Sequence, residues 1–339
     1  MESVNTTQNQ RLGSESPSQT NSPITTLHHD IHREIFLSNA NIFAEKKCLE
    51  TTRLSSQVCH TWRSHILNSP TIWGRLLELS ALERCTEQWR EEVLRRSGDS
   101  LLWIYGHASG SFTYPRIGTK FFYRILNTYW ERIEHLSMTT MDLPIDEELW
   151  QPLLRPAPFL QSFSVVPLGL RRVVNHFPAS NFNTPSSPLF SDHAPVLRKF
   201  CTNGFAFSLT SPWLADLCNL HLFHPVSVSE ILNALRSTPF LTTLAISGTA
   251  ERSLDSESSL PSVILANLTS LTFTDIWLPH VTKFITHIRP TNGCSLFCTS
   301  EFSSNVNEDL RALSRPLSRW FQSYLRNNHV TNIRLDLGI

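Results

Sequence analysis

The sequence predicts a mixed α/β protein in which a module of three short helices precedes a longer region of alternating strands and helices. Apolar residues recur at helical spacing between Pro23 and Trp73. From about residue 100 onward, a Leu-x-x-Leu-x-Leu pattern recurs, and the stretches between its copies often carry helical periodicity. The hydrophobic share of 40% is sufficient for a substantial core.

The chain divides into four parts by composition. Residues 1–22 are dominated by Ser, Thr, Asn and Gln, which bury little surface, so we expect a disordered tail. Residues 23–75 form the helical module and 76–99 a linker helix. Residues 100–339 form the domain of strands and helices.

The helical module carries two apolar stripes. Leu27, Ile31, Ile35 and Phe36 fall at i, i+4, i+8 and i+9, which places them on one helix face. Helices this short are marginal alone in water, so they must pack on each other or on a partner. The second stripe consists of Leu54, Val58, Cys59, Trp62 and Ile66.

Two further helices are predicted at the end of the module and directly after it. Ser69-Pro70 predicts a helix start, because Ser can cap free N–H groups and Pro is tolerated at the first helical position. Trp73 is then expected on the inner side of that last turn. The segment 83–97 predicts an amphipathic helix that stops at Gly98.

These residues resemble an F-box, in the form seen in fungal F-box proteins. The resemblance covers about residues 24–74 and is most specific at VCHTWR (58–63) and SPTIW (69–73). Leu94-Arg95-Arg96-Ser97 is similar to an element that precedes the first strand in those proteins. The residues expected in the core or at a partner contact are Leu27, Ile31, Ile35, Phe36, Leu54, Val58, Cys59, Trp62, Pro70 and Trp73.

The resemblance implies that the module docks a Skp-type adaptor, and through it a cullin scaffold, in an SCF cullin–RING ubiquitin ligase. The sequence departs from the family pattern at two places. His28 stands where the family has Pro, and His32 stands where it usually has Leu. A histidine on this helix face is expected to weaken an apolar contact, more so when it is protonated.

The later part of the chain resembles an irregular leucine-rich-repeat solenoid, with starts spaced 20 to 37 residues apart. Helical patterns between the units cover 119–131, 145–154, 228–237, 279–289 and 307–327. The alternative is an ordinary α/β domain with several Leu-rich strands. The units are Leu102-Ile104, Ile133-Leu136-Met138, Leu160-Phe163-Val165, Leu197-Phe200-Thr202, Leu217-Leu220-Leu222, Leu241-Leu244-Ile246, Leu268-Leu271-Phe273, Leu296-Cys298 and Val330-Ile333-Leu335.

One feature predicts that the repeat is irregular. The consensus has Asn or Cys at the ninth position, where the side chain satisfies backbone groups at the turn. Pro- and Ser-rich loops at 176–195 and 247–262 are expected to interrupt the series. The ninth positions hold Met141, Leu168, Phe205, Pro225, Thr249, Ile276 and Gly338.

Composition excludes several classes of function. The 29 basic and 29 acidic residues balance, so neither a nucleic-acid face nor a polybasic membrane patch is predicted. No apolar run approaches the roughly 18 residues of a membrane span, and no secretion signal is expected. Seven scattered cysteines predict reduced thiols and a cytoplasmic or nuclear location.

The search for catalytic and metal-binding motifs favours neither. Cys218, His221 and His224 have ligand types at close spacing, but His221 alternates with inward leucines, so the three are not expected to converge. His28 and His32 share the i, i+4 spacing that can bind a metal, without an evident third ligand. Cys294 and Cys298 lack a second pair. We expect no cofactor, no metal and no nucleophile–base pair, and hence no hydrolase.

Two functions follow from these observations. The first is a non-enzymatic substrate receptor, whose module docks the adaptor and whose repeats recruit an unknown target protein. The second is a repeat scaffold whose F-box-like helices only cap the open end of the solenoid, as solenoids require. Exposed apolar residues at Leu27, Ile31 and Ile35 favour docking, and burial of these residues against 83–97 favours the cap.

Overall fold

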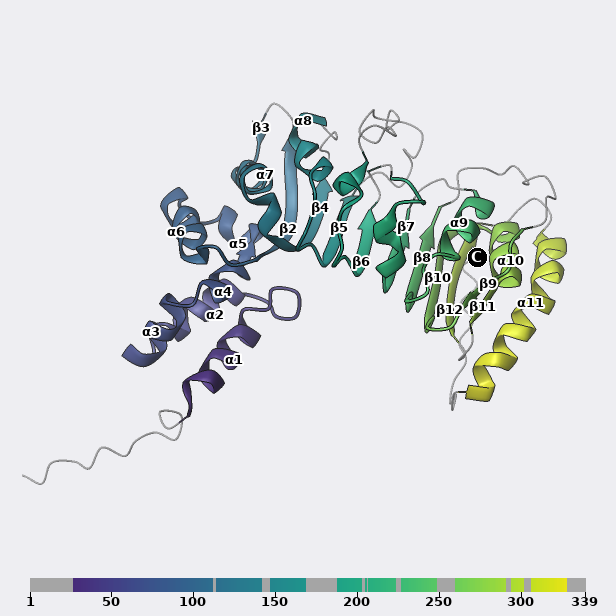
Figure 1. The fold of residues 1–339 in the computed structure, drawn as a ribbon, viewed down its shortest axis with the longest axis horizontal. Coiled ribbons are helices and arrows are strands. Elements are labelled where there is room, and N and C mark those ends of the chain that lie inside the picture. The colour runs from purple at the N-terminus through teal and green to yellow at the C-terminus, as the bar shows by residue number, and fades with distance from the viewer. Residues whose placement is uncertain are drawn as a thin grey trace, which may run out of the picture.

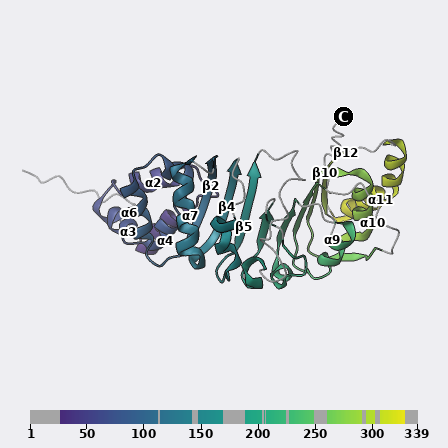
Figure 2. The ribbon, with the colours of Figure 1, turned by 90° about the horizontal axis from the view of Figure 1, so that it is seen from above.

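The computed structural model describes residues 27–111, 114–141, 147–168, 188–202, 205, 207–223, 227–248, 260–290, 294–301 and 306–327. The expected tail at 1–22, the last repeat unit at 330–335 and His224 lie outside these residues. The described part is an elongated row of strands, with the N-terminal helices at one end and α10 and α11 at the other (Figures 1 and 2).

The N-terminal module contains four helices and not the predicted three: α1 (His29–Asn39), α2 (Cys48–Ser55), α3 (His60–Leu67) and α4 (Pro70–Gly74). The predicted second stripe is not one helix, because the backbone leaves the helix between Ser55 and His60 and divides it into α2 and α3. The predicted start at Ser69-Pro70 is confirmed, with Ser69 as N-cap and Pro70 at the first helical position.

In the segment after the module, the helix is shorter than the one predicted. A two-residue strand, β1 (Leu77–Glu78), leads into α5 (Leu79–Glu83) and then α6 (Glu87–Ser97). The helix predicted over 83–97 begins only at Glu87, because the hydroxyl of Thr86 accepts a hydrogen bond from the backbone N–H of Trp89 at 3.3 Å. It ends at Ser97, and Gly98 follows with φ of 48°.

Eight strands of the large sheet occur where the repeat units predict them, and β1 and β3 were not predicted. All pair in parallel in the order β1-β2-β4-β5-β6-β7-β8-β10-β12, and β3 (Tyr114–Pro115) pairs antiparallel with β2. A second sheet pairs β9 (Val263–Leu265) with β11 (Ile288–Pro290). The long-sheet strands are β2 (Leu102–Ser111), β4 (Ile133–Met141), β5 (Ser162–Leu168), β6 (Lys199–Thr202), β7 (Asn219–Leu222), β8 (Thr243–Ser247), β10 (Ser270–Trp277) and β12 (Ser295–Glu301).

The strand register aligns the central apolar residue of each unit. These residues form one continuous cross-strand row, and all but the last are at most 3% exposed. Each inward side chain is therefore covered by its neighbours on both sides, which makes its burial favourable. The row is Ile104, Leu136, Phe163, Phe200, Leu220, Leu244, Leu271 and Leu296.

A backbone hydrogen-bond pattern also recurs at the strand entrances. One carbonyl before or at the start of a strand accepts from two successive N–H groups of the next unit, with N···O distances of 2.8–3.2 Å. The units therefore share one entrance geometry although their lengths differ. The accepting carbonyls belong to Gln161, Arg198, Cys218 and Thr242, and the donor pairs are 198–199, 218–219, 242–243 and 269–270.

Helices and 3-10 turns cover the apolar face of the sheet. Between β5 and β7 the described covering elements are 3-10 turns, and aromatic rings fill the layer there. The ring centres of Phe190 and Phe163 are 5.3 Å apart, and those of Trp213 and Phe200 are 4.8 Å apart. The covering elements are α7 (Ile117–Tyr129), η2 (Trp130–Arg132), α8 (Glu147–Trp150), η3 (Gln151–Leu154), η5 (Leu189–Asp192), η6 (Pro212–Asp216), α9 (Val228–Leu235), α10 (Leu278–His287) and α11 (Val306–Asn327).

Two of the ninth positions are filled by buried apolar residues. Phe205 is 1% exposed and Ile276 is fully buried. At these positions, packing replaces the polar side chain that the consensus uses at the turn.

In the part of the chain that the structure describes, none of the helices combines the length and the apolar character needed to cross a bilayer.

Candidate protein-docking surface

Exposed apolar side chains gather on the N-terminal module. Among the described residues, twelve large apolar side chains are exposed, and five of them lie between residues 31 and 58. Ile31 is 47% exposed, Ile35 40%, Leu54 51% and Val58 64%. We call these four residues the docking surface. Single exposed apolar residues are normal, so it is their grouping within one small helical module that makes this module the candidate interaction site.

Helix α1 divides its side chains between the docking surface and the module core. Ile31 and Ile35 are one helical turn apart and point outward, whereas His32 and Phe36, one position further along, are 4% and 3% exposed. The ring of Phe36 lies edge-on to Trp62 at 5.2 Å. The predicted single face of Leu27, Ile31, Ile35 and Phe36 is therefore split between two sides of the helix.

The expectation for His32 is wrong. Its ring is inside the module, 6.3 Å from Trp62 and 5.8 Å from His65, and not on the face that Ile31 and Ile35 present to solvent. The pairing of His28 with His32 as metal ligands fails for the same reason. His28 is the exposed N-cap of α1, and its side chain accepts a hydrogen bond from the N–H of Asp30.

The tip of the turn between α2 and α3 carries Val58 and Cys59, both exposed. Cys59 is the N-cap of α3, and its sulfur accepts a hydrogen bond from the backbone N–H of Trp62 at 3.5 Å. This break in the helix turns Val58 to solvent. A continuous helix through 54–62 would have aligned Val58 with the half-buried Trp62.

The other predicted site residues lie in the module core or at its junction with the sheet domain. Phe36 and Trp73 are buried, and Leu27 and Trp62 are half-buried. Pro70 is exposed at the start of α4, where its carbonyl accepts a hydrogen bond from the hydroxyl of Ser100 at 2.9 Å. Pro70 therefore lies at the junction with the sheet domain.

Trp73 anchors the end of the module. Its indole N–H donates to the carbonyl of Ile66 at 2.8 Å, which ties α4 to α3. Its ring meets Trp89 of α6 edge-on at 6.2 Å, and the guanidinium of Arg96 lies 5.1 Å from the ring centre. A single buried indole thus connects three helices of the N-terminal region.

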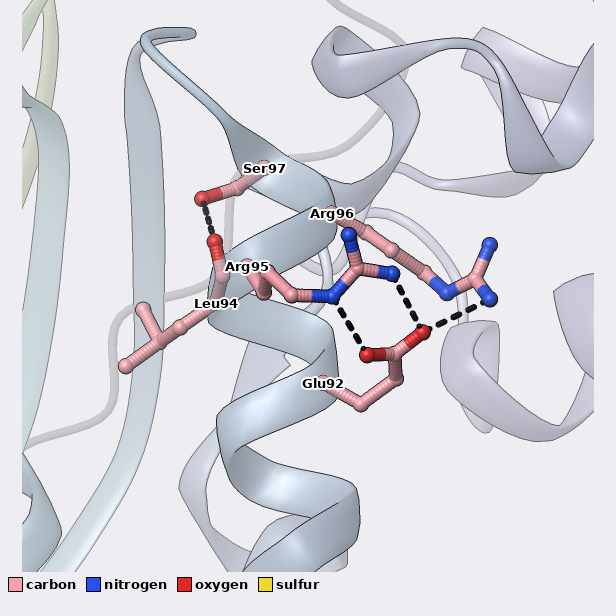
Figure 3. Close-up of polar contacts among 5 residues, drawn as sticks. All are labelled: Glu92, Leu94, Arg95, Arg96 and Ser97. Carbon is pink, nitrogen blue, oxygen red and sulfur yellow. Dashed lines mark hydrogen bonds and ion pairs between the residues drawn. The ribbon is translucent and has the colours of Figure 1, made fainter.

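The Leu94-Arg95-Arg96-Ser97 element closes α6 (Figure 3). Glu92 accepts from Arg95 at 2.7 and 2.8 Å and pairs with Arg96 at 2.7 Å. The hydrogen bond from Arg95 lowers the pKa of the Glu92 carboxyl to about 2. The Ser97 hydroxyl donates to the carbonyl of Leu94 at 2.7 Å and accepts from Arg132 at 3.1 Å, so the motif joins α6 to the entrance of β4.

A second junction joins the loop after α1 to the first strands. The ring centre of Phe43 lies 5.7 Å from that of Trp103 and 5.9 Å from that of Tyr105, and both of these residues are on β2. Arg75 donates to the carbonyl of Leu37 at 3.4 Å and stacks 4.3 Å over Trp103. Sequence reasoning missed Phe43 and Arg75 because each sits outside any apolar period. These contacts hold the module at a defined angle to the sheet.

The open face of the sheet carries a short chain of polar side chains. His221 contacts Cys201 on β6 at 3.6 Å and Ser247 on β8 at 3.0 Å. Burial raises the pKa of the Cys201 thiol to about 11 and lowers the pKa of His221 to about 4. At neutral pH, a protonated thiol lies beside a neutral imidazole, which is the wrong charge state for a nucleophile.

The two free cysteines of the C-terminal region, Cys294 and Cys298, are also expected to react slowly. Burial raises the pKa of Cys294 to about 12 and that of Cys298 to about 11. The carbonyl of Cys294 accepts the indole N–H of Trp320 at 2.8 Å, which connects α11 to the entrance of β12. The backbone of Cys294 therefore helps to hold the last helix in place.

A groove of about 730 Å³ lies between α2 and the α5–α6 segment. Arg53 and Arg84 line it together with Trp89. Glu50 also lines the groove and lies one helical turn before Leu54 on α2, so the groove adjoins this residue of the docking surface. It offers a mixed polar and aromatic recess beside the exposed apolar residues.

A scan against models of known protein families and a search of curated proteins both found no match to this chain.

Proposed function

We propose that this chain is a substrate-receptor subunit of an SCF cullin–RING ubiquitin ligase. Its F-box-like module docks a Skp-type adaptor, and its sheet domain recruits a target protein. The observation that carries the proposal is the docking surface: Ile31, Ile35, Leu54 and Val58 are 40–64% exposed on a module that already has a packed core.

The position of the module argues against a role as a cap alone. The N-terminal edge of the sheet is paired by β1, whose Leu77 aligns with Ile104 of β2. Gly106 of β2 lies so close to α5 that a Cβ there would meet Leu79 at 2.9 Å. The edge is thus covered without any use of Ile31 or Ile35, and the cap hypothesis gives no reason for their exposure.

The sheet domain supports the target-recruiting half of the proposal as an irregular leucine-rich-repeat-like solenoid. The aligned apolar row and the recurring strand-entrance hydrogen bonds are features of a repeated unit. Its open face presents half-exposed side chains from several strands, such as Ser164, His221 and Thr272. A target would be read by several of these strands together.

In this proposal the chain is not itself an enzyme and uses no cofactor. Its contribution is to hold the target near the ubiquitin-transfer machinery, which the partner subunits supply. The fixed junction at Trp103 and Arg75 suits this role, because a defined angle between the module and the sheet sets where the target lies. The site of action is the cytoplasm or the nucleus.

Co-purification with a Skp-type adaptor tests the proposal. The wild-type chain should retain the adaptor, and the Ile31→Asp variant should lose it because the charge replaces an apolar contact. Ile117→Asp is the matched control, since Ile117 is 55% exposed on α7, outside the module. Equal retention by the wild type and Ile31→Asp, or no retention by a folded wild type, would contradict docking.

A further inference from the structure

Three consecutive residues at the start of α1 bring metal-binding atoms together. Nδ1 of His28 lies 3.2 Å from one carboxylate oxygen of Asp30, and Nε2 of His29 lies 3.1 Å from the other. All three ligand atoms lie within 4.8 Å of one another. The two imidazole rings are 4.3 Å apart between centroids, so both converge on the same carboxylate.

The two nitrogen–oxygen distances are close to the edge of a metal coordination polyhedron. Zinc binds histidine nitrogen and carboxylate oxygen at about 2.0–2.2 Å, so two of its tetrahedral ligands are about 3.4 Å apart. Two imidazoles and one carboxylate form a donor set that suits zinc, nickel and copper rather than calcium or magnesium. Asp30 also supplies the negative charge that offsets the unfavourable position of a cation at a helix N-terminus.

We propose that His28, His29 and Asp30 form a binding site for a divalent transition-metal ion such as Zn²⁺. The site differs from the pair at i, i+4 that the sequence indicated, because His32 is buried and the carboxylate of Asp30 takes its place. Binding would withdraw His28 Nδ1 from its 3.4 Å hydrogen bond with the backbone N–H of Asp30. That bond is long, so little capping is lost.

The site is open on its outer side and borders the docking surface. The three side chains are 63–67% exposed, so the remaining coordination positions are available to water or to a ligand from a bound partner. Ile31 follows Asp30 directly in the chain. A metal here would therefore lie at the rim of the surface formed by Ile31, Ile35, Leu54 and Val58.

Calorimetric titration of the full chain, without a polyhistidine tag, with ZnCl₂ at pH 7.5 tests the site. The wild type should bind one equivalent that the His28→Gln, His29→Gln double variant binds more than about tenfold more weakly. Asp30→Asn should weaken the same event. His60→Gln is the matched control, because His60 is also exposed near a helix start yet belongs to no such cluster, and it should bind as the wild type does.

A titration after treatment with iodoacetamide separates this site from thiol ligands elsewhere. Alkylated thiols no longer bind zinc, whereas His28, His29 and Asp30 should still bind it. Circular dichroism melts of each variant check that the fold is retained. If the wild type binds no zinc at pH 7.5, or if the double variant binds as tightly as the wild type, the proposal is overturned.

Discussion

At the scale of single residues, the decisive feature is how α1 divides its apolar and polar side chains. A histidine, His32, is packed against Trp62, while two isoleucines, Ile31 and Ile35, remain in solvent. A helix that served only its own core would be expected to bury the isoleucines and expose the imidazole. The reversed arrangement is explained if Ile31 and Ile35 are buried by a partner.

Cys59 provides a direct probe of that partner. It is exposed at the tip that also carries Val58, whereas the pKa values of Cys201, Cys294 and Cys298 are raised to about 11–12 by burial. At pH 8, iodoacetamide should therefore alkylate Cys59 before these three, because the thiolate is the nucleophile. Mass spectrometry of tryptic peptides measures the order.

Addition of a Skp-type adaptor should then slow alkylation of Cys59 and leave the other rates unchanged. Cys59→Ser serves as the labelling control. If Cys59 reacts equally fast with and without a saturating adaptor, the turn between α2 and α3 is not part of the contact.

His221 makes the stability of the sheet domain depend on pH. Its folded-state pKa of about 4 lies below its ordinary value, so between about pH 6.5 and pH 4 the unfolded chain binds a proton that the folded chain does not. Stability should therefore fall as the pH falls through this window. Because the ring is partly exposed, we expect a loss on the order of 1 kcal/mol between pH 7 and pH 5.

Urea unfolding at the two pH values measures this loss. His221→Gln should reduce the difference, although His135, whose pKa is also lowered by burial, keeps part of it. An unchanged pH dependence in His221→Gln would mean that the ring is protonated equally easily in both states.

At the scale of elements, the sequence predicts the long and strongly periodic pieces. The apolar periods place α7, α9, α10 and α11 and the strands of the long sheet close to their observed bounds. Ser69-Pro70 predicts α4 because capping and a fixed proline φ are local properties. Strands β1, β9 and β11 are two or three residues long and exist through pairing with distant segments, which no local pattern reveals.

The candidate site could be predicted only in part. The apolar period does not reveal which of its residues face solvent. The helix is interrupted between Ser55 and His60, and this break changes the direction of the side chains that follow Ser55. The residues concerned are Ile31, Ile35, Leu54 and Val58. The cluster of His28, His29 and Asp30 depends on the cap geometry of α1. The junction residues Phe43 and Arg75 depend on contacts with β2.

Gly74 marks the point where α4 meets the sheet domain. A Cβ at this position would lie 2.3 Å from the backbone carbonyl oxygen of Leu101, which cannot move as a side chain can. Gly74→Ala should therefore lower the free energy of unfolding by roughly 1–3 kcal/mol. Urea unfolding measures the change, and Lys120→Ala on the exposed side of α7 should stay within about 0.5 kcal/mol of the wild type. A neutral Gly74→Ala would contradict the close approach at this junction.

At the scale of the whole molecule, helices lie at both ends of the long sheet. Strand β1 and α5 lie at the first edge, and α11 is joined to the entrance of the last strand through Trp320, which is 5% exposed. The helices α1 to α3 lie outside this row, beyond α4 (Figure 1). The molecule thus has a body built on one long parallel sheet and an N-terminal module with exposed apolar residues.

Hydrogen exchange should reflect this division. The central strands β5 to β8 should be protected longest, since their inward residues are covered on both sides. Helices α1 to α3 should exchange faster than α7, α9 and α10, because each buries at most three side chains whereas the other three bury four or more. Mass spectrometry of deuterated peptides measures both, and uniform protection along the chain would contradict a separable module.

The most direct test of docking through α1 is a calorimetric titration of the full chain with a Skp-type adaptor, in the wild type, in Ile35→Asp and in Ile117→Asp. Docking predicts a 1:1 complex in the wild type and in Ile117→Asp. It also predicts a complex about 100-fold weaker in Ile35→Asp, as expected for a charge placed in a buried contact. Equal affinities of all three proteins would contradict docking through α1, as would a folded wild type that does not bind.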